Sequence, residues 1–261
     1  MIKLNNLNLK NTAENLIETF LKAGKIAKEI SKRGVKITIK EDKSPVTDGD
    51  LAVDEILRLK IKKLTPNLPI VSEETENLDA KNINKDFWLI DPIDGTKDYI
   101  KKKDEYTLNA ALIINLQPAL GMVYAPEKNR LFFSYGKNLA FEITNGKRMV
   151  LNCKKRNVDE IIGLENSGNT SSQILNIYKK HKVTQTLKMS SSLKFCILSS
   201  GEADIYAANA RAYEWDIAAG HAILEHAGGS ITDHQGNKFS YGKENYKNLP
   251  IIAKRAVNLE K

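Results

Sequence analysis

The sequence predicts a mixed α/β fold of two lobes, on three observations. Apolar residues recur every three or four positions over residues 13–33 and again after Asp48, which indicates two amphipathic helices. Residues 107–151 contain short apolar runs separated by turn residues, which is typical of consecutive antiparallel strands. Beyond residue 152, strand-like and helix-like segments alternate. We therefore expect an N-terminal lobe over residues 1–152 and a C-terminal lobe over residues 153–261.

The composition is that of an ordinary soluble globular protein, with 41% hydrophobic and 28% charged residues. The net charge of +8 favours anionic partners such as phosphorylated metabolites, nucleic acid or acidic lipid. Lysines are nevertheless scattered, and the longest run, Lys101–Lys103, is interpreted as a solvated loop rather than a nucleic-acid site. No segment approaches about 18 uninterrupted apolar residues, so we expect a cytoplasmic protein. Cys153 and Cys196 are expected to be reduced.

The elements of the N-terminal half follow from periodicity and turn residues. They are listed in chain order: helix 13–33 ending at Gly34; strand 35–39; a helix that starts at Thr47 or Asp48 and reaches Leu64; a strand within 68–74; strand 87–90; strands 107–115, 119–124 and 130–135, with Gln117-Pro118 as a turn; and a hairpin of 140–144 with 148–151 around Asn145-Gly146.

The elements of the C-terminal half are listed in the same way: strand 161–165; helix 171–180; strand 183–189; a helix after Ser190–Ser192; strand 203–207; a helix within 213–229 that starts near Asp216 and ends at Gly228-Gly229; a hairpin from 231–234 into Phe239; and a final strand within 249–253. His221 and His226 are about 140° apart on their helix and do not form a shared metal face.

Two carboxylates follow the apolar run 87–90 at a spacing of three, Asp91 and Asp94. Pro92 has no N–H and is expected to end the strand, and Gly95 allows a tight turn. Carboxylates held so close repel each other unless a proton or a cation lies between them, and a hard divalent cation would satisfy both. An Asp-rich turn that holds its own backbone is the alternative explanation of this spacing.

Other acids and hydroxyls have both a structural and a functional interpretation. Asp50 and Asp216 suit helix N-termini, where acidic side chains are favourable. Glu73 ends the strand that precedes Asp91 in the chain, so neighbouring strands would bring the two acids together. The stretch Ser190–Ser192, with Lys194, either caps a helix or binds phosphate at its N-terminus.

In this order the acids resemble the metal-dependent, lithium-sensitive phosphatase family that includes the inositol monophosphatases. The matching motifs are Asp50, Ser72-Glu73-Glu74, Asp91-Pro-Ile-Asp-Gly-Thr96 and Trp215-Asp-Ile-Ala-Ala219. Within the family the chain looks most like the CysQ-type 3′(2′),5′-bisphosphate nucleotidases, on fragments that include Lys43-Ser-Pro-Val-Thr47, Asp94-Gly-Thr-Lys97, Leu120–Pro126 and Ser191-Ser-Leu-Lys-Phe-Cys196. The tail segment Lys247–Pro250 departs from the subgroup pattern, so the resemblance assigns no tail contact with the substrate.

The resemblance implies the layered αβαβα sandwich of the sugar phosphatases, with the active site between the lobes. The implied reaction releases the 3′-phosphate of adenosine 3′,5′-bisphosphate as inorganic phosphate and leaves AMP. Hydrolysis of inositol monophosphate or another sugar phosphate is the alternative on the same site, and a sensor that binds a phosphorylated ligand is the non-enzymatic one. The implied protein is a monomer or homodimer, does not bind nucleic acid, and is either free in the cytoplasm or peripheral to the inner face of the cell membrane.

The resemblance also assigns roles to residues. Two or three Mg²⁺ ions are implied, with inhibition by lithium, and their ligands are Glu73, Asp91, the Ile93 carbonyl, Asp94 and Asp216. The catalytic residues are Asp50, Glu73 and Thr96, where Thr96, polarised by Asp50, would orient or deprotonate the attacking water. The substrate contacts are Glu73, Ile93, Asp94, Gly95, Thr96, Ser191, Lys194 and Asp216. Most metal ligands thus fall in the N-terminal lobe, and the C-terminal lobe adds Asp216 and substrate contacts.

Overall fold

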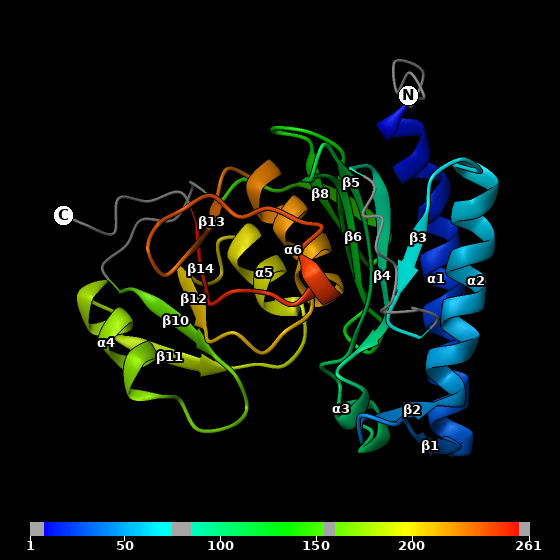
Figure 1. Cartoon of the computed structure of the whole chain (residues 1–261), viewed down its shortest axis with the longest axis horizontal. Coiled ribbons are helices and arrows are strands. Elements are labelled where there is room, and N and C mark those ends of the chain that lie inside the picture. The colour runs from blue at the N-terminus through cyan, green and yellow to red at the C-terminus, as the bar shows by residue number, and fades with distance from the viewer. Residues whose placement is uncertain (1–7, 75–84, 154–159, 256–261) are drawn as a thin grey trace.

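The structure is a computed structural model that describes residues 8–74, 85–153 and 160–255. Five layers follow one another across the molecule: two long helices, a seven-stranded sheet, two central helices, a five-stranded sheet and a last helix (Figure 1). The helices are α1 (Leu9–Arg33), α2 (Asp48–Leu64), α3 (Thr96–Ile100), α4 (Ser172–Lys180), α5 (Leu193–Ser199) and α6 (Glu214–His226). The predicted αβαβα sandwich is confirmed.

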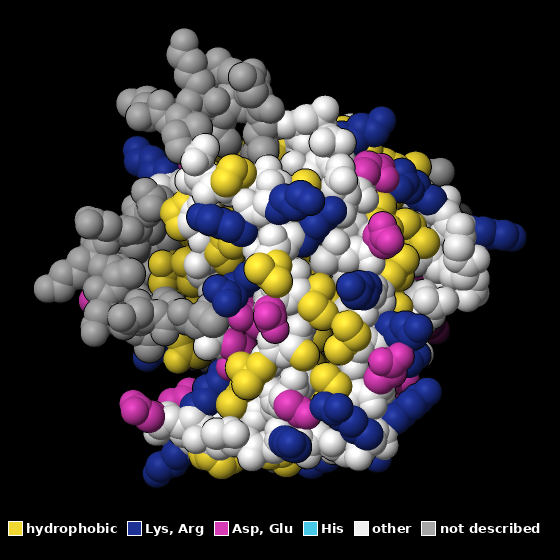
Figure 2. Space-filling model, turned by 90° about the vertical axis from the view of Figure 1, so that its right-hand side faces the viewer, with side chains coloured by type: hydrophobic (Ala, Val, Ile, Leu, Met, Phe, Trp, Pro, Cys, Tyr) yellow, Lys and Arg dark blue, Asp and Glu magenta, His cyan; other side chains and the backbone are white. Residues whose placement is uncertain are grey.

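Helices α1 and α2 cover the outer face of the large sheet. The side chain of Asn8 caps α1, and Gly34 ends it with φ 95°, a conformation that glycine adopts without strain. One stripe of each helix is buried against the sheet, as the periodicity predicts. On the opposite face, basic side chains lie among apolar and acidic ones (Figure 2). No described helix has the length and apolar character needed to cross a membrane.

The large sheet has the order β3-β4-β5-β6-β7-β8-β9. Its strands are β3 (Ile70–Ser72), β4 (Phe87–Asp94), β5 (Thr107–Ile114), β6 (Gln117–Ala125), β7 (Arg130–Ser134), β8 (Ala140–Thr144) and β9 (Lys147–Val150). Strand β3 is parallel to β4, and every later pair is antiparallel. The predicted meander is therefore confirmed. A separate hairpin of β1 (Ile37–Ile39) and β2 (Pro45–Thr47) precedes α2.

Two details of the predicted strands are wrong. Strand β4 does not end before Pro92 but runs to Asp94, and the pairing moves from Asp91↔Asn109 to Asp94↔Thr107. Between these two pairs the chain advances by three residues along β4 and by two along β5. This difference is a β-bulge, and it accommodates Pro92, which has no N–H to donate. The other detail is the turn predicted at Gln117-Pro118. The chain turns instead at Asn115 and Leu116, both with positive φ, and β6 already starts at Gln117.

The small sheet has the order β11-β10-β12-β14-β13. Its strands are β10 (Ile162–Glu165), β11 (Gln185–Lys188), β12 (Ile205–Ala208), β13 (Ser230–Asp233) and β14 (Ile251–Lys254). Helix α4 packs on its outer face through Ile174 and Tyr178. Beyond β13 the predicted hairpin is reduced to a single bridge, Thr232↔Lys238, so no strand reaches Phe239.

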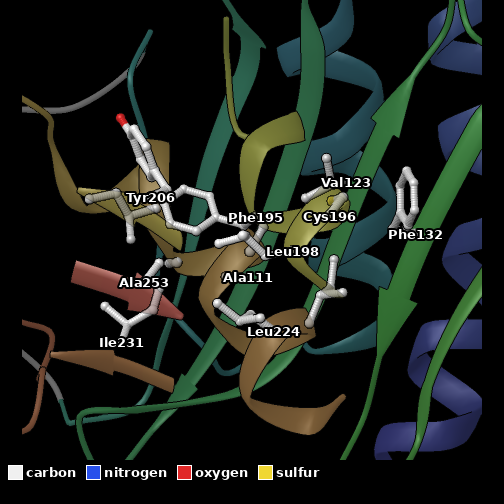
Figure 3. Packing of buried hydrophobic residues seen from close by; sticks show 14 of the residues in the cluster. Ala111, Val123, Phe132, Phe195, Cys196, Leu198, Tyr206, Leu224, Ile231 and Ala253 are labelled. Atoms are coloured by element: carbon white, nitrogen blue, oxygen red, sulfur yellow. The ribbon is translucent and has the colours of Figure 1, made fainter. Parts of the chain in front are cut away.

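One hydrophobic core joins the two sheets through α5 and α6. It combines Ala111 and Val123 of the large sheet with Phe195 of α5, Leu224 of α6 and Ala253 of the small sheet (Figure 3). Both cysteines are buried in this core and form no disulfide, as expected. The predicted lobe boundary after residue 152 lies next to residues 154–159, which the structure does not describe. The boundary stays a prediction.

Helix α6 lies against the backbone of β6 at Gly121. A Cβ atom placed on Gly121 would stand 2.3 Å from the Ala219 carbonyl oxygen and 2.8 Å from the Ala222 Cβ. Real Cβ atoms do not approach backbone so closely, so the helix and the sheet could not keep this separation with any side chain here.

We expect Gly121→Ala to lower the free energy of unfolding by about 1–3 kcal/mol, the usual effect of an extra methyl group in a packed core. The shift in the urea midpoint measures this effect. Gly168→Ala is the matched control, because no heavy atom lies within 4 Å of its added Cβ, and it should change stability by less than about 0.5 kcal/mol. Equal effects of the two variants would contradict the close contact at α6.

Candidate active site

Two acids of the site come from adjacent parallel strands. Ser72 of β3 pairs with Ile90 of β4, and the next residue, Glu73, donates its N–H to the Ile90 carbonyl at 3.1 Å. Glu73 and Asp91 therefore lie at the same sheet edge, as the sequence predicts. Asp216 of α6 joins them, and one carboxylate oxygen from each of the three residues lies within 4.8 Å of the others.

Asp216 has a structural role as well. It is the third residue of α6, and its Oδ2 accepts the Tyr213 N–H at 2.8 Å, as in a capping box. The helix-cap interpretation from sequence is thus true and does not exclude a place in the acidic cluster. Because the cap fixes the carboxylate, Asp216 faces Asp91 and Glu73 in a defined position.

The acidic cluster is electrostatically unfavourable by itself. Asp91 is 1% exposed, and its Oδ1 has no hydrogen-bond partner in the described part of the chain. Burial and the negative charges of Glu73, Asp94 and Asp216 raise the pKa of Asp91 well above its usual range. Burial and the neighbouring acids also raise the pKa of Asp216. A divalent cation among these oxygens would offset the repulsion, and the donor set of oxygens suits a hard ion.

Asp94 lies near this group but is not one of the three acids whose oxygens lie within 4.8 Å of one another. Its Oδ2 accepts hydrogen bonds from Ser192, at 2.5 Å from the backbone N and 2.9 Å from Oγ. The Ser192 Oγ also lies 2.5 Å from the Asp216 carbonyl oxygen. The Asn109 side-chain amide donates a hydrogen bond to the Ser192 Oγ. Ser192 thereby connects two of the predicted ligands. Ser191 was predicted from the sequence as a substrate contact and Ser192 was not, although both belong to the hydroxyl-rich stretch Ser190–Ser192.

Asp50 and Thr96 meet as the sequence-based assignment requires. Asp50 is the third residue of α2, and its Oδ2 accepts the Thr47 N–H at 2.8 Å in a capping box. Its Oδ1 lies 3.2 Å from the Thr96 Oγ, which is also 3.1 Å from the Ile93 carbonyl oxygen. Gly95, with φ 95°, turns the chain from β4 into α3, so that Thr96 begins that helix. Burial raises the pKa of Asp50.

Lys40 contacts two acids of the site and was not predicted from the sequence. It follows β1 in the hairpin, and its Nζ lies 3.4 Å from Glu73 Oε1 and 2.8 Å from Glu74 Oε2. Burial raises the pKa of Glu74 to about 7, although Lys40 acts in the opposite direction. Lysines are frequent throughout this chain, so nothing in the local sequence distinguishes Lys40 from the others.

A cavity of about 280 Å³ opens beside the acids, near the lower end of the range for small-molecule sites. Of the predicted substrate contacts, Asp94, Gly95, Ser191, Lys194 and Asp216 line it. The predicted contacts that do not line this cavity are Glu73, Ile93 and Thr96.

Lys194 is a buried cation in the cavity wall. Its Nζ donates to the main-chain carbonyls of Ser191 at 2.7 Å and Met189 at 3.3 Å. Burial lowers the pKa of Lys194 to about 8, while Asp94 acts to raise it. The Ser192 side chain forms no cap hydrogen bond at the start of α5, whereas the Ser191 Oγ accepts the Leu193 N–H at 3.4 Å. The capping interpretation therefore holds for Ser191 and not for Ser192. The roles assigned to these residues stay predictions.

The protein combines a five-layered αβαβα fold with an acidic cluster suited to cations and a neighbouring cavity that contains Lys194. These features define a class of proteins that bind metal ions and phosphorylated small molecules. Residues 8–257 match the inositol monophosphatase family, and the chain belongs to that family. The family is metal-dependent, in agreement with the acidic cluster.

Relatives with assigned activities are similar over most of their length. The 3′(2′),5′-bisphosphate nucleotidase CysQ of Buchnera aphidicola is 34% identical over 212 residues, which cover 81% of this chain and 79% of the relative. CysQ of Escherichia coli strain K12 is 34% identical over 78% of this chain and 82% of its own length. The crystal structure of CysQ from Bacteroides thetaiotaomicron, 27% identical, superposes with a TM-score of 0.83 over 97% of this chain and all of that one (100%).

Proposed function

We propose that the chain is a metal-dependent 3′(2′),5′-bisphosphate nucleotidase that hydrolyses adenosine 3′,5′-bisphosphate to AMP and phosphate. The observation that carries the proposal is the cluster of Glu73, Asp91 and Asp216 directly beside the cavity that contains Lys194. The acidic cluster can hold cations, and the cavity with Lys194 can bind an anion. Hydrolysis of a phosphate ester requires both. The similarity to CysQ enzymes supports the choice of substrate.

Mg²⁺ is the proposed metal, with two or three ions per site and inhibition by lithium. Glu73, Asp91, Asp94, Asp216 and the Ile93 carbonyl would hold the ions, because all of these donors are oxygens in one acidic region. When bound, the ions neutralise charge that develops on the attacking and leaving oxygens.

Thr96 and Asp50 are proposed to orient the attacking water. The Thr96 hydroxyl has one proton and two nearby acceptors, Asp50 Oδ1 and the Ile93 carbonyl oxygen. Donation to either acceptor leaves a lone pair on Oγ that can accept a hydrogen bond from water. The backbone N–H groups of Gly95 and Thr96, together with Ser191 and Lys194, would hold the phosphate and the rest of the substrate.

We propose further that the enzyme works in the cytoplasm, free or peripheral to the inner face of the cell membrane, as a monomer or homodimer. The substrate assignment does not depend on either point. Gel filtration of the purified chain and fractionation of cells measure them directly.

Phosphate release in the presence of Mg²⁺ tests the proposal, with adenosine 3′,5′-bisphosphate, inositol 1-phosphate and fructose 1,6-bisphosphate compared in parallel. We expect the highest kcat/KM with the adenosine bisphosphate. A preference for the inositol ester would contradict the subgroup assignment, whereas the assignment as a phosphatase of this family would still hold. Absence of hydrolysis across metals and pH values would favour a phosphorylated-ligand sensor.

A further inference from the structure

Asn109 of β5, which was predicted from the sequence only as part of a strand, is a buried polar side chain beside the acidic cluster. Side chains of a strand alternate between its two faces. Leu108 and Ala110 pack in the core beneath α1 and α2, whereas Ala111 belongs to the core that contains α5 and α6. Asn109 therefore faces α5 and α6, and its exposed fraction is 0%. An amide buried in this way costs free energy unless its donors and its acceptor have partners.

The strand pairing places Asn109 directly opposite Asp91. The two residues form the last pair of β4 and β5 before the bulge that contains Pro92. Opposite residues of an antiparallel pair carry their side chains on the same face of the sheet, with Cβ atoms about 5 Å apart. The Asn109 side chain is thus next to a carboxylate that the proposed metal site requires.

The amide nitrogen of Asn109 donates to groups at Asp94. Its Nδ2 lies 3.2 Å from the Ser192 Oγ. Burial raises the pKa of Asp94, and a hydrogen bond from the Asn109 side chain is among the interactions that act against this rise. A primary amide has two N–H donors, so one side chain can serve both Ser192 and Asp94. An ionised carboxylate only accepts, which determines that the nitrogen of the amide faces Asp94.

Ser192 extends these contacts to α6. Its backbone N and its Oγ lie 2.5 and 2.9 Å from Asp94 Oδ2, and its Oγ also lies 2.5 Å from the Asp216 carbonyl oxygen. The Ser192 hydroxyl has one proton and receives a hydrogen bond from Asn109, so its proton is left for one of these two oxygens. Asn109, Ser192 and Asp94 therefore form one hydrogen-bonded unit that joins the large sheet to the starts of α5 and α6.

The carbonyl oxygen of the Asn109 side chain has no partner. Asn109 Oδ1 is buried and accepts no hydrogen bond in the described part of the chain, and the same holds for Asp91 Oδ1 on the facing strand. The Thr107 Oγ, two residues earlier on the same face of β5, is likewise without a partner among the described residues. Buried oxygens of native proteins almost always have a partner. A hydrated cation beside Asp91 offers both positive charge and hydrogen-bond donors, so this group of oxygens fits the proposed metal site.

We propose that Asn109 is a positioning residue of the metal site, whose amide donors hold Asp94 and Ser192 in the arrangement that binds the cation. The inference rests on the proposed function, because it takes Asp94 as one of the metal ligands. Loss of a group that is hydrogen-bonded to a metal ligand typically weakens metal affinity or activity by about 10- to 100-fold. A purely structural amide would instead contribute to stability and leave the affinity for the ion unchanged.

Asn109→Ala removes both amide donors, and calorimetric titration of the full chain with Mg²⁺, without substrate, measures the effect. We expect the Kd for Mg²⁺ to rise about 10- to 100-fold. The value of kcat/KM should fall at low Mg²⁺ and recover in large part at high Mg²⁺, because the ligands themselves are intact. The melting temperature in EDTA should decrease, since buried hydrogen bonds are lost.

Ser134→Ala is the matched control for lost stability. Ser134 is a buried hydroxyl of β7 in the same sheet, and its Oγ lies 2.9 Å from the His226 Nδ1. Its replacement should also lower the melting temperature, but it should change the Kd for Mg²⁺ by less than about twofold. Equal changes in Kd for Ser134→Ala and Asn109→Ala would overturn the proposal, because the effect would then follow stability rather than position.

Ser192→Ala provides a second variant of the same hydrogen-bonded unit. It should weaken Mg²⁺ binding as Asn109→Ala does, and the double variant should lose less than the product of the two single losses, because the two side chains share one contact. A lower melting temperature with an unchanged Kd in both single variants would overturn the proposal. The titrations contain no substrate. A parent chain that binds Mg²⁺ and hydrolyses no bisphosphate would therefore contradict the proposed nucleotidase, while the change in Kd would still decide the role of Asn109.

Discussion

Asp91→Asn should abolish phosphate release while the metal-free chain keeps or gains stability. Asp91 is buried among other acids, so removal of its charge relieves repulsion that the folded chain otherwise contains. Asparagine keeps the shape of the side chain, and the packing should not change. Melting temperatures in EDTA should therefore equal or exceed the parent value, whereas the increase on addition of Mg²⁺ should shrink with the affinity for the ion.

Asp216→Asn is expected to behave in the same way, because an amide oxygen can still accept the Tyr213 N–H that caps α6. Asp104→Asn is the control: Asp104 is an exposed acid paired with Lys128, and its replacement should affect neither activity nor the response to Mg²⁺. A large loss of metal-free stability in both site variants would instead support purely structural roles, as a turn residue and a helix cap.

Thr96→Ala should lower kcat by about 10²- to 10⁴-fold, the usual range for a positioned acid–base group. The effect on Mg²⁺ binding should be small, because the hydroxyl is not among the proposed ligands. Thr96→Ser keeps the oxygen and should retain much more activity, with a less restricted side-chain rotamer. The measurements are kcat at saturating substrate and the Mg²⁺ dependence of the melting temperature.

The partner of Thr96 is tested by a double-mutant cycle. Asp50→Asn should resemble Thr96→Ala, because the 3.2 Å contact between the two side chains makes them one unit. The double variant should then be little worse than either single variant. Losses that add in the double variant would mean that Asp50 and Thr96 act separately, and the proposed orientation of water would be wrong even if the phosphatase assignment held.

The sequence predicted the parts of the site that depend on regular elements. Glu73 and Asp91 end two apolar runs close together in the chain, and the parallel pairing of β3 with β4 brings them side by side. Asp50 and Asp216 were ambiguous between cap and site, and the structure explains why: each occupies the third position of a helix and forms a capping box. In both cases the cap holds the carboxylate toward the site, so local pattern alone could not separate the two roles.

Residues that reach the site from loops could not be predicted. Lys40 and Ser192 lie outside the helices and strands, and their contacts depend on how distant segments meet. The bulge at Pro92 has a similar origin. Proline usually ends a strand, but here the pairing with β5 on both sides of the bulge keeps the strand continuous.

The contact between α6 and β6 at Gly121 has a consequence for the metal site that we propose. The contact fixes Asp216 relative to the sheet that carries Asp91, because helix and strand meet with no side chain between them. A rigid frame of this kind favours a small ion with strict octahedral geometry, whereas a larger ion such as Ca²⁺ needs more ligands at longer distances. Discrimination between divalent ions of equal charge would then depend as much on a glycine in the sheet as on the carboxylates themselves.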